Sequence, residues 1–159
     1  MADVAGSKWP WVAAAFLLAW SPARADEMKT YVKRGMAYDD VKMDIETAIE
    51  GKGLKIGAVG DLGDMFARTQ ADIAKGPAIY KSAHYYQFCS AMLAHKLTAA
   101  DPNNLGHCPF LMFSYETAAK PGEVVVGYRT LTRAGSAATR AVLDEVDAMF
   151  DAIAREAVK

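Results

Sequence analysis

The feature that most constrains the fold is a pair of strand-like segments joined by a short turn. Residues 109–117 and 123–130 are rich in β-branched and aromatic side chains, and residues 118–122 between them end in glycine. A connection of this length is typical of a β-hairpin. Because no helix-like segment separates these later strands, the chain lacks the strand–helix alternation of a doubly wound fold. The pattern predicts a mainly antiparallel sheet with helices on one side.

The other elements can be placed by their hydrophobic periodicity and their stop signals. We expect strands at residues 28–32, 54–59 and 78–88, and helices starting at Asp39 or Asp40 and at residues 65–74 and 90–99. The clearest helix begins after Ser136, where apolar residues recur at helical spacing: Val142, Val146, Met149, Phe150, Ile153 and Ala157. The sequence therefore predicts one α+β domain that ends in a long helix.

The first 25 residues have the three parts of a cleavable secretory signal peptide. A short polar region ends in Lys8, residues 9–20 are apolar except for Pro10, and Ala23 and Ala25 stand at the positions that signal peptidase reads. The apolar run is too short to cross about 30 Å of hydrocarbon comfortably as a helix. We therefore expect residues 1–25 to be removed and residues 26–159 to work in the periplasm; a retained membrane anchor is the alternative. The mature chain has no other stretch of membrane-spanning length.

Charge and motif content argue against several classes of function. The formal net charge of −1 provides no concentrated basic face for nucleic acid. The sequence has no Gly-x-Ser-x-Gly elbow, and Asp61 and Asp64 stand where helix caps are needed. No catalytic set is recognised, so a conventional enzyme is disfavoured although enzymatic activity stays open.

Cys89 and Cys108 are the only cysteines, and an oxidising compartment would allow them to pair. Three interpretations compete. The first is a structural disulfide. The second is a redox-active pair, because Cys89 lies near a helix N-terminus, where its thiolate would be stabilised. In the third, the sulfur atoms belong to a metal or haem site.

The metal interpretation rests on a cluster of soft and borderline ligands between residues 84 and 115. The three histidines, His84, His95 and His107, lie there with Met92 and both cysteines. Such a set suits copper or haem iron. Their spacings match no established haem, zinc or metalloprotease motif, so these residues are weak candidates.

Aromatic and charged strand residues suggest a ligand site. Tyr86 and Tyr115 could line an apolar pocket, although strand aromatics usually fill the core. Arg129 lies on a strand expected to be buried, so it needs an acceptor. That acceptor is either an acid such as Glu116 or an anionic ligand.

Four short motifs resemble the family known as domain of unknown function 302. They are Phe88-Cys89-Ser90, Ala100-Asp101-Pro102, Cys108-Pro109-Phe110 and Gly127-Tyr128-Arg129. The resemblance covers residues 28–131, with the helix at 136–158 as an addition. It implies a curved antiparallel sheet backed by helices, similar to half of the TATA-binding protein, and a homodimer. A functional centre of that family would place Cys89, Asp101, Cys108 and Arg129 at the site.

Two functions follow as expectations. The first is a small periplasmic binding or accessory module that holds a cofactor, a small ligand or a protein partner on a tyrosine-lined sheet face or at the dimer interface. The alternative is a redox protein that cycles Cys89 and Cys108 with a periplasmic partner, or that binds haem or copper.

Overall fold

A computed structural model describes residues 27–74, 76–131 and 134–159. The predicted signal peptide at residues 1–25 lies outside the described residues. The described part of the chain contains no helix that is both long enough and apolar enough to cross a membrane.

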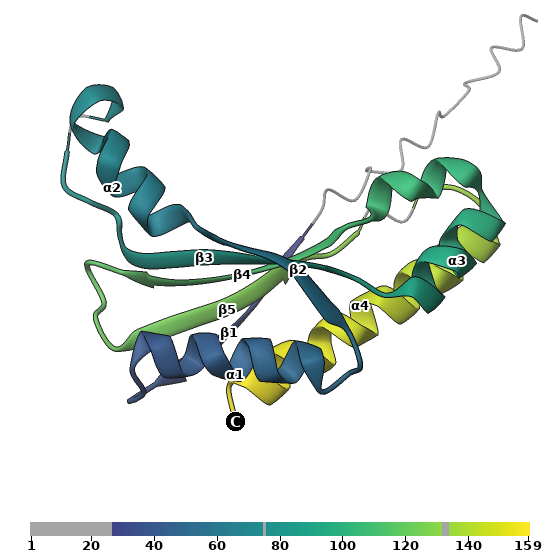
Figure 1. The fold of residues 1–159 in the computed structure, drawn as a ribbon, viewed down its shortest axis with the longest axis horizontal. Coiled ribbons are helices and arrows are strands. Elements are labelled where there is room, and N and C mark those ends of the chain that lie inside the picture. The colour runs from purple at the N-terminus through teal and green to yellow at the C-terminus, as the bar shows by residue number, and fades with distance from the viewer. Residues whose placement is uncertain (1–26, 75, 132–133) are drawn as a thin grey trace, which may run out of the picture.

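A five-stranded antiparallel sheet with the strand order β1-β5-β4-β3-β2 forms the centre of the molecule (Figure 1). The strands are β1 Met28–Arg34, β2 Lys55–Asp61, β3 Tyr80–Cys89, β4 Phe110–Thr117 and β5 Glu123–Arg129. β4 and β5 form the hairpin predicted from the short turn, and β1 pairs with β5 at the edge. The predicted α+β class with an open antiparallel sheet is confirmed.

Two helices, α1 (Tyr38–Glu50) and α4 (Ala137–Ala157), lie side by side against one face of the sheet (Figure 1). α3 (Ala91–Ala100) packs against α4, and the 3₁₀ helix η1 (Pro102–His107) follows it. α2 (Leu62–Ile73) is the exception to the expectation of helices on one face. It packs against β3 from the other side and buries none of its own residues.

The core lies between the sheet and the α1–α4 layer. The apolar stripe predicted for the last helix faces this core, and Val146, Phe150 and Ile153 are almost completely buried. Phe150 is surrounded by the rings of Phe88, Phe110 and Tyr128, at centroid distances of 6.0, 5.7 and 5.0 Å. α4 therefore supplies the centre of an aromatic core.

Most helix starts are capped by the side chains that the sequence predicts. Ser136 Oγ accepts a hydrogen bond from the Thr139 amide at 3.1 Å, and Asp61 Oδ1 accepts one from the Asp64 amide at 2.7 Å. The expected cap of α1 by Asp39 or Asp40 is wrong, because this helix begins earlier, at Tyr38, with Ala37 as its N-cap. The two aspartates lie in the first turn instead, where the helix dipole favours negative charge.

Arg129 and Glu116 do not pair, and Arg129 is not buried. The carboxylate of Glu116 accepts hydrogen bonds from the Gly122 amide at 2.7 Å and from Lys81 Nζ at 3.0 Å. Arg129 is exposed at the far end of the hairpin and points to the opposite face of the sheet. β5 is buried from Val124 to Tyr128, and Arg129, its last residue, is exposed.

Cys89 and Cys108 are bonded to each other, with their Cα atoms 6.3 Å apart. The disulfide joins the last residue of β3 to the segment just before β4. It closes the connection made by α3 and η1, and both cysteines are partly exposed.

Candidate functional site

The sheet face turned away from α1 and α4 is the candidate site, and we call it the open face. Side chains alternate between the two faces of a strand. One of the two sets of side chains faces the core and includes Val126, Tyr128, Met112 and Phe88. The alternate set forms the open face: Met28, Thr30 and Val32 of β1; Val125, Gly127 and Arg129 of β5; Leu111, Phe113, Tyr115 and Thr117 of β4; Ala83, Tyr85 and Gln87 of β3.

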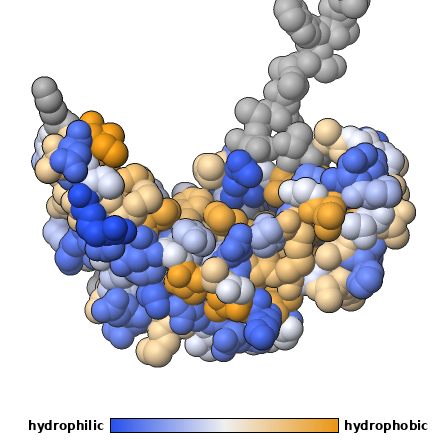
Figure 2. Space-filling model, turned by 45° about the horizontal axis from the view of Figure 1, so that its top comes forward, coloured by the Kyte–Doolittle hydropathy of each residue, from blue (hydrophilic) through white to orange (hydrophobic). Residues whose placement is uncertain are grey.

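The open face is largely apolar. Figure 2 shows hydrophobic surface in the hollow between the two ends of the molecule. Met28, Val32 and Leu111 are 58%, 39% and 45% exposed there. A cluster of exposed large apolar side chains is a mark of a binding surface in a soluble protein.

Two aromatic rings lie against glycines of the neighbouring strand. Phe113 pairs with Gly127, where a Cβ atom would lie only 2.6 Å from the Phe113 ring. Tyr85 pairs with Gly60 in the same way, and a Cβ there would overlap the Tyr85 ring. Only glycine leaves room for these rings, and covering a glycine with a cross-strand aromatic is a known stabilising device in sheets. The open face is consequently low and smooth at these points.

A row of aromatic rings runs along the open face from β4 to α2. Phe113 and Tyr115 stack with centroids 6.2 Å apart, and Tyr115 meets Tyr80 edge to face at 5.5 Å. Tyr80 stacks in turn on Phe66 of α2 at 5.6 Å. Such pairs stabilise each other by about 0.5–1.5 kcal/mol beyond area burial. They hold α2 over this end of the sheet.

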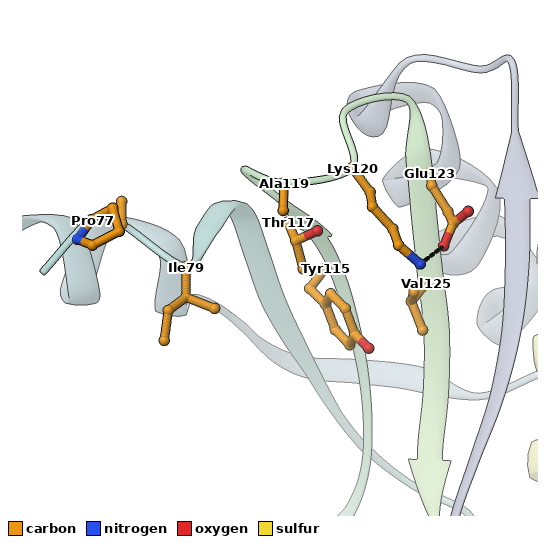
Figure 3. Close-up of a pocket in the computed structure, with 9 residues that line it drawn as sticks. Pro77, Ile79, Tyr115, Thr117, Ala119, Lys120, Glu123 and Val125 are labelled. Atoms are coloured by element: carbon orange, nitrogen blue, oxygen red, sulfur yellow. Dashed lines mark ion pairs between the residues drawn. The ribbon is translucent and has the colours of Figure 1, made fainter.

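A pocket of about 440 Å³ hollows the open face beside the β4–β5 turn (Figure 3), and we call it the hairpin pocket. Ile79 and Tyr115 flank it, and Val125 lies on the β5 side. Lys120 Nζ lies 3.5 Å from Glu123 Oε1 at its rim. This pocket therefore combines an apolar wall with charges of both signs.

A second pocket, of about 350 Å³, lies at the opposite end of β4 and β5, and we call it the basic pocket. Its lining residues are Met28, Gly106, His107, Pro109, Phe110, Leu111, Phe113, Arg129, Leu131 and Phe150. Arg129 comes from the end of β5 and His107 from the end of η1. None of these described lining residues is acidic, so the pocket joins an apolar wall to basic side chains only.

A buried polar cluster lies on the other face of the sheet, under α1. The Tyr38 hydroxyl lies 3.0 Å from His84 Nδ1 and 2.9 Å from Ser114 Oγ. Ser114 Oγ also lies 2.9 Å from the Tyr86 hydroxyl. His84 Nε2 is 3.7 Å from Asp61 Oδ2 near the surface. The hydroxyls of Tyr38, Ser114 and Tyr86 thus each have a partner within this cluster, as burial of polar groups requires.

This cluster predicts alkaline sensitivity. Burial raises the pKa of Tyr38 from its ordinary 10.0 to about 12, and burial also raises the pKa of Tyr86. Above about pH 10 the unfolded chain loses phenol protons that the folded chain keeps, so stability falls as pH rises towards the folded pKa values. We expect the free energy of unfolding to fall by at most about 1.4 kcal/mol per pH unit for each phenol. Urea unfolding between pH 8 and 11.5 measures this slope.

Tyr38→Phe is the matched variant for that measurement. It removes one of the two phenols, so its unfolding free energy should fall less steeply with pH than that of the natural chain. An equal slope in both proteins would contradict the assignment of the effect to this cluster.

The candidate metal ligands do not come together. His84 belongs to the buried cluster, His95 and Met92 lie on α3 with Met92 65% exposed, and His107 lines the basic pocket. In residues 27–74, 76–131 and 134–159, no three His, Cys, Asp or Glu side chains are grouped so that they could hold a metal ion. The three histidines stand on three different elements, His84 on β3, His95 on α3 and His107 on η1.

The four ligand-binding candidates are divided by the fold. Tyr115 lines the hairpin pocket and Arg129 lines the basic pocket. Tyr86 is fully buried in the core and bonded to Ser114, so it cannot contact a ligand on the open face. Asp101 caps η1 by accepting a hydrogen bond from the Asn103 amide at 2.8 Å.

Phe113 and Leu111 are site residues that the sequence reasoning missed. The signal was present in β4, where residues 110–113 are all apolar. A strand that is apolar at both alternating positions needs cover on both faces. Only one face of this sheet is covered by the α1–α4 layer, so the other set of side chains remains on the open face.

Comparison with known proteins supports the fold and the family. A family model described as "Domain of unknown function DUF302" matches residues 28–157, a range that includes α4 and so extends beyond residue 131. A crystal structure of an uncharacterized conserved protein DUF302 from Bacillus stearothermophilus superposes with a TM-score of 0.67 at 9% sequence identity. The superposition covers 83% of this chain and 98% of that one. A search of curated proteins found no match.

Proposed function

Because the chain belongs to the DUF302 family, a name that specifies no activity, we propose a function from the geometry of the site: a small periplasmic module that binds an apolar ligand on its open sheet face. The observation that carries this proposal is the open face itself. It is largely apolar, and two pockets, of about 350 and 440 Å³, lie on it at the two ends of β4. Pockets of this size and lining are typical of small-molecule sites.

The two pockets belong to one continuous row of side chains. Phe113 lines the basic pocket, Tyr115 lines the hairpin pocket, and their rings stack on each other. Burial of an alkyl chain or ring along this row of side chains would be favourable at about 25 cal/mol per Å² of apolar surface.

Titration with 1-dodecanol, an uncharged apolar probe, tests this function. We expect amide chemical shifts to change along β4 and β5, because the probe lies on these strands. Leu111→Ser should weaken binding by about tenfold, since Leu111 contributes exposed apolar surface to the basic pocket.

Met92→Ser is the control for that variant. Met92 is another exposed apolar side chain, on α3 and outside both pockets. It should leave binding unchanged. Shift changes scattered over the whole surface, or equal losses in the two variants, would contradict the proposal.

Redox activity is a second candidate, favoured by a partly exposed disulfide. On this proposal, a periplasmic partner would exchange electrons with Cys89 and Cys108 by thiol–disulfide exchange. Haem or copper would have to be held by ligands that the fold separates, which makes this the weaker form of the proposal. An absorption spectrum and metal analysis of protein purified from periplasm test it directly.

A homodimer and the periplasmic location also belong to the proposal. Light scattering after size exclusion gives the mass of the assembly. N-terminal sequencing of the exported protein checks for cleavage after Ala25.

A further inference from the structure

We propose that the hairpin pocket binds a free α-amino acid with a large apolar side chain, whose carboxylate contacts Lys120 and whose ammonium contacts Glu123. This inference rests on the proposed function and adds the pocket, the chemical class and the orientation of the ligand. It follows from the way in which an apolar wall and charges of both signs meet in a single pocket.

The two charges of the hairpin pocket lie together on its β5 side, and Ile79 lies on the opposite side (Figure 3). Lys120 Nζ and Glu123 Oε1 are 3.5 Å apart, which is longer than a normal N–H···O hydrogen bond. The side chain of Lys120 is 69% exposed and that of Glu123 is 21% exposed. An exposed ion pair contributes little to stability, so a ligand can come between the two groups at little cost.

Glu123 uses its two carboxylate oxygens differently. Oε2 accepts hydrogen bonds from Arg34 Nε at 3.0 Å and from Arg34 Nη2 at 2.8 Å, whereas Oε1 is the oxygen on the side of Lys120. The Arg34 guanidinium holds the pKa of Glu123 below its usual range, so the carboxylate is charged at neutral pH. Arg34 therefore orients this carboxylate from outside the pocket, and Oε1 is the acceptor for the ammonium of the ligand.

Backbone hydrogen bonds hold the walls of the hairpin pocket together. The Glu123 amide donates to the Lys120 carbonyl oxygen at 3.3 Å, and the Lys120 amide donates to that of Thr117 at 3.2 Å. The Ala118 amide donates to the Ile79 carbonyl oxygen at 2.9 Å, which joins the segment before β3 to the β4–β5 turn. A site that is formed before binding loses less conformational entropy when the ligand arrives.

A free α-amino acid matches this arrangement because its ammonium and its carboxylate are attached to the same carbon atom. Both groups can therefore meet Glu123 and Lys120 on one side of the pocket, while the side chain extends over the apolar wall. A purely anionic ligand would also meet the carboxylate of Glu123, and a purely cationic ligand would also meet the ammonium of Lys120. The volume of about 440 Å³ lies at the lower end of the range for small-molecule sites, which suits a ligand as small as one amino acid.

Five probes, each lacking a different part of the ligand or none, test the inference. They are L-phenylalanine, 3-phenylpropanoate without the ammonium, 2-phenylethylamine without the carboxylate, 3-phenyl-1-propanol without either charge, and glycine without the side chain. We expect L-phenylalanine to bind about fivefold more tightly than either singly charged probe, because an exposed ion pair contributes up to about this factor. Glycine should bind more weakly than every phenyl probe, since it has no apolar surface to bury. Amide chemical shifts of β4, β5 and the turn between them locate the binding, and their titration gives the affinities.

Two charge variants test the orientation of the ligand. Lys120→Gln should weaken the binding of L-phenylalanine about fivefold without weakening that of 2-phenylethylamine, which has no carboxylate. Glu123→Gln should weaken L-phenylalanine by a similar factor without weakening 3-phenylpropanoate, which has no ammonium. Ile79→Ser should weaken all four phenyl probes alike, because Ile79 contributes to the apolar wall.

Lys96→Gln is the matched control for these variants. Lys96 is an exposed lysine of α3 that pairs with Glu145 at 2.6 Å, and it lies outside the hairpin pocket. This variant should bind every probe as the natural chain does. Thermal unfolding verifies that all four variants are folded.

Each failure has its own signature. If the four phenyl probes shift the same amides around the hairpin pocket with equal affinity, the pocket binds apolar ligands but the assignment of an amino acid is overturned. If L-phenylalanine keeps its preference over 2-phenylethylamine in Lys120→Gln, the position of its carboxylate is overturned. If no phenyl probe binds in the hairpin pocket while 1-dodecanol shifts β4 and β5, the inference fails and the proposed function stands. If 1-dodecanol has no effect either, the proposed function fails as well.

Discussion

Replacing Phe150 with alanine is expected to lower the free energy of unfolding by about 3–5 kcal/mol, the usual cost of removing a buried phenylalanine. Phe150 is 1% exposed, and its ring lies between those of Phe88, Phe110 and Tyr128. These neighbours belong to three different strands, so the cavity left by alanine cannot be filled by moving one element. Urea unfolding followed by circular dichroism gives the change directly.

Met43→Ala is the comparison for this variant. Met43 lies on α1 and is 60% exposed, so its truncation should change stability by no more than about 0.5 kcal/mol. A small loss for Phe150→Ala would mean that α4 does not contribute to the core. Because the family match extends to residue 157, we expect α4 to be an integral part of the domain.

Replacing Cys89 and Cys108 together by serine is expected to lower the free energy of unfolding by about 3 kcal/mol. The disulfide links two residues with a sequence separation of 19. A cross-link of this span lowers the conformational entropy of the unfolded chain, which stabilises the folded state by about 3 kcal/mol. The bond also ties η1, which carries His107, to the end of β3. Chemical unfolding of the double variant and of the oxidised natural chain measures the loss.

The same variant separates the structural interpretation from the redox interpretation. If the disulfide is structural, the double serine variant should be less stable than the natural chain. It should still bind dodecanol at a temperature where it is folded. A redox pair predicts that the natural protein exchanges electrons with a thiol–disulfide partner and that the variant cannot. Resistance of the natural disulfide to mild reductant would contradict the redox proposal.

Elements whose signals are local could be predicted well. The turn at 118–122 implied the hairpin, the stripe through Val146, Phe150 and Ile153 implied a core-facing helix, and Ser136 implied its start. Each of these signals lies within a few residues along the chain. The start of α1 was less well defined, because Ala37 provides no side-chain cap and Asp39 and Asp40 only stabilise the first turn.

The candidate site could be predicted only in part. Of the four ligand-binding candidates, Tyr115 and Arg129 line pockets, whereas Tyr86 faces the core and Asp101 caps η1. All four are polar residues on or beside strands, and residue type alone does not distinguish them. Their roles depend on which face of the sheet the two long helices cover.

By itself, then, the sequence determined the α+β class, the antiparallel hairpin, most helices and the family. Those properties depend on periodicity, turn residues and short motifs, which are written along the chain. Only the tertiary structure decided that α1 and α4 leave one sheet face open, that the histidines are separated, and that Arg129 and His107 line one pocket. These properties depend on contacts between residues far apart in the chain, where strand register and helix placement, rather than residue type, decide which side chains meet.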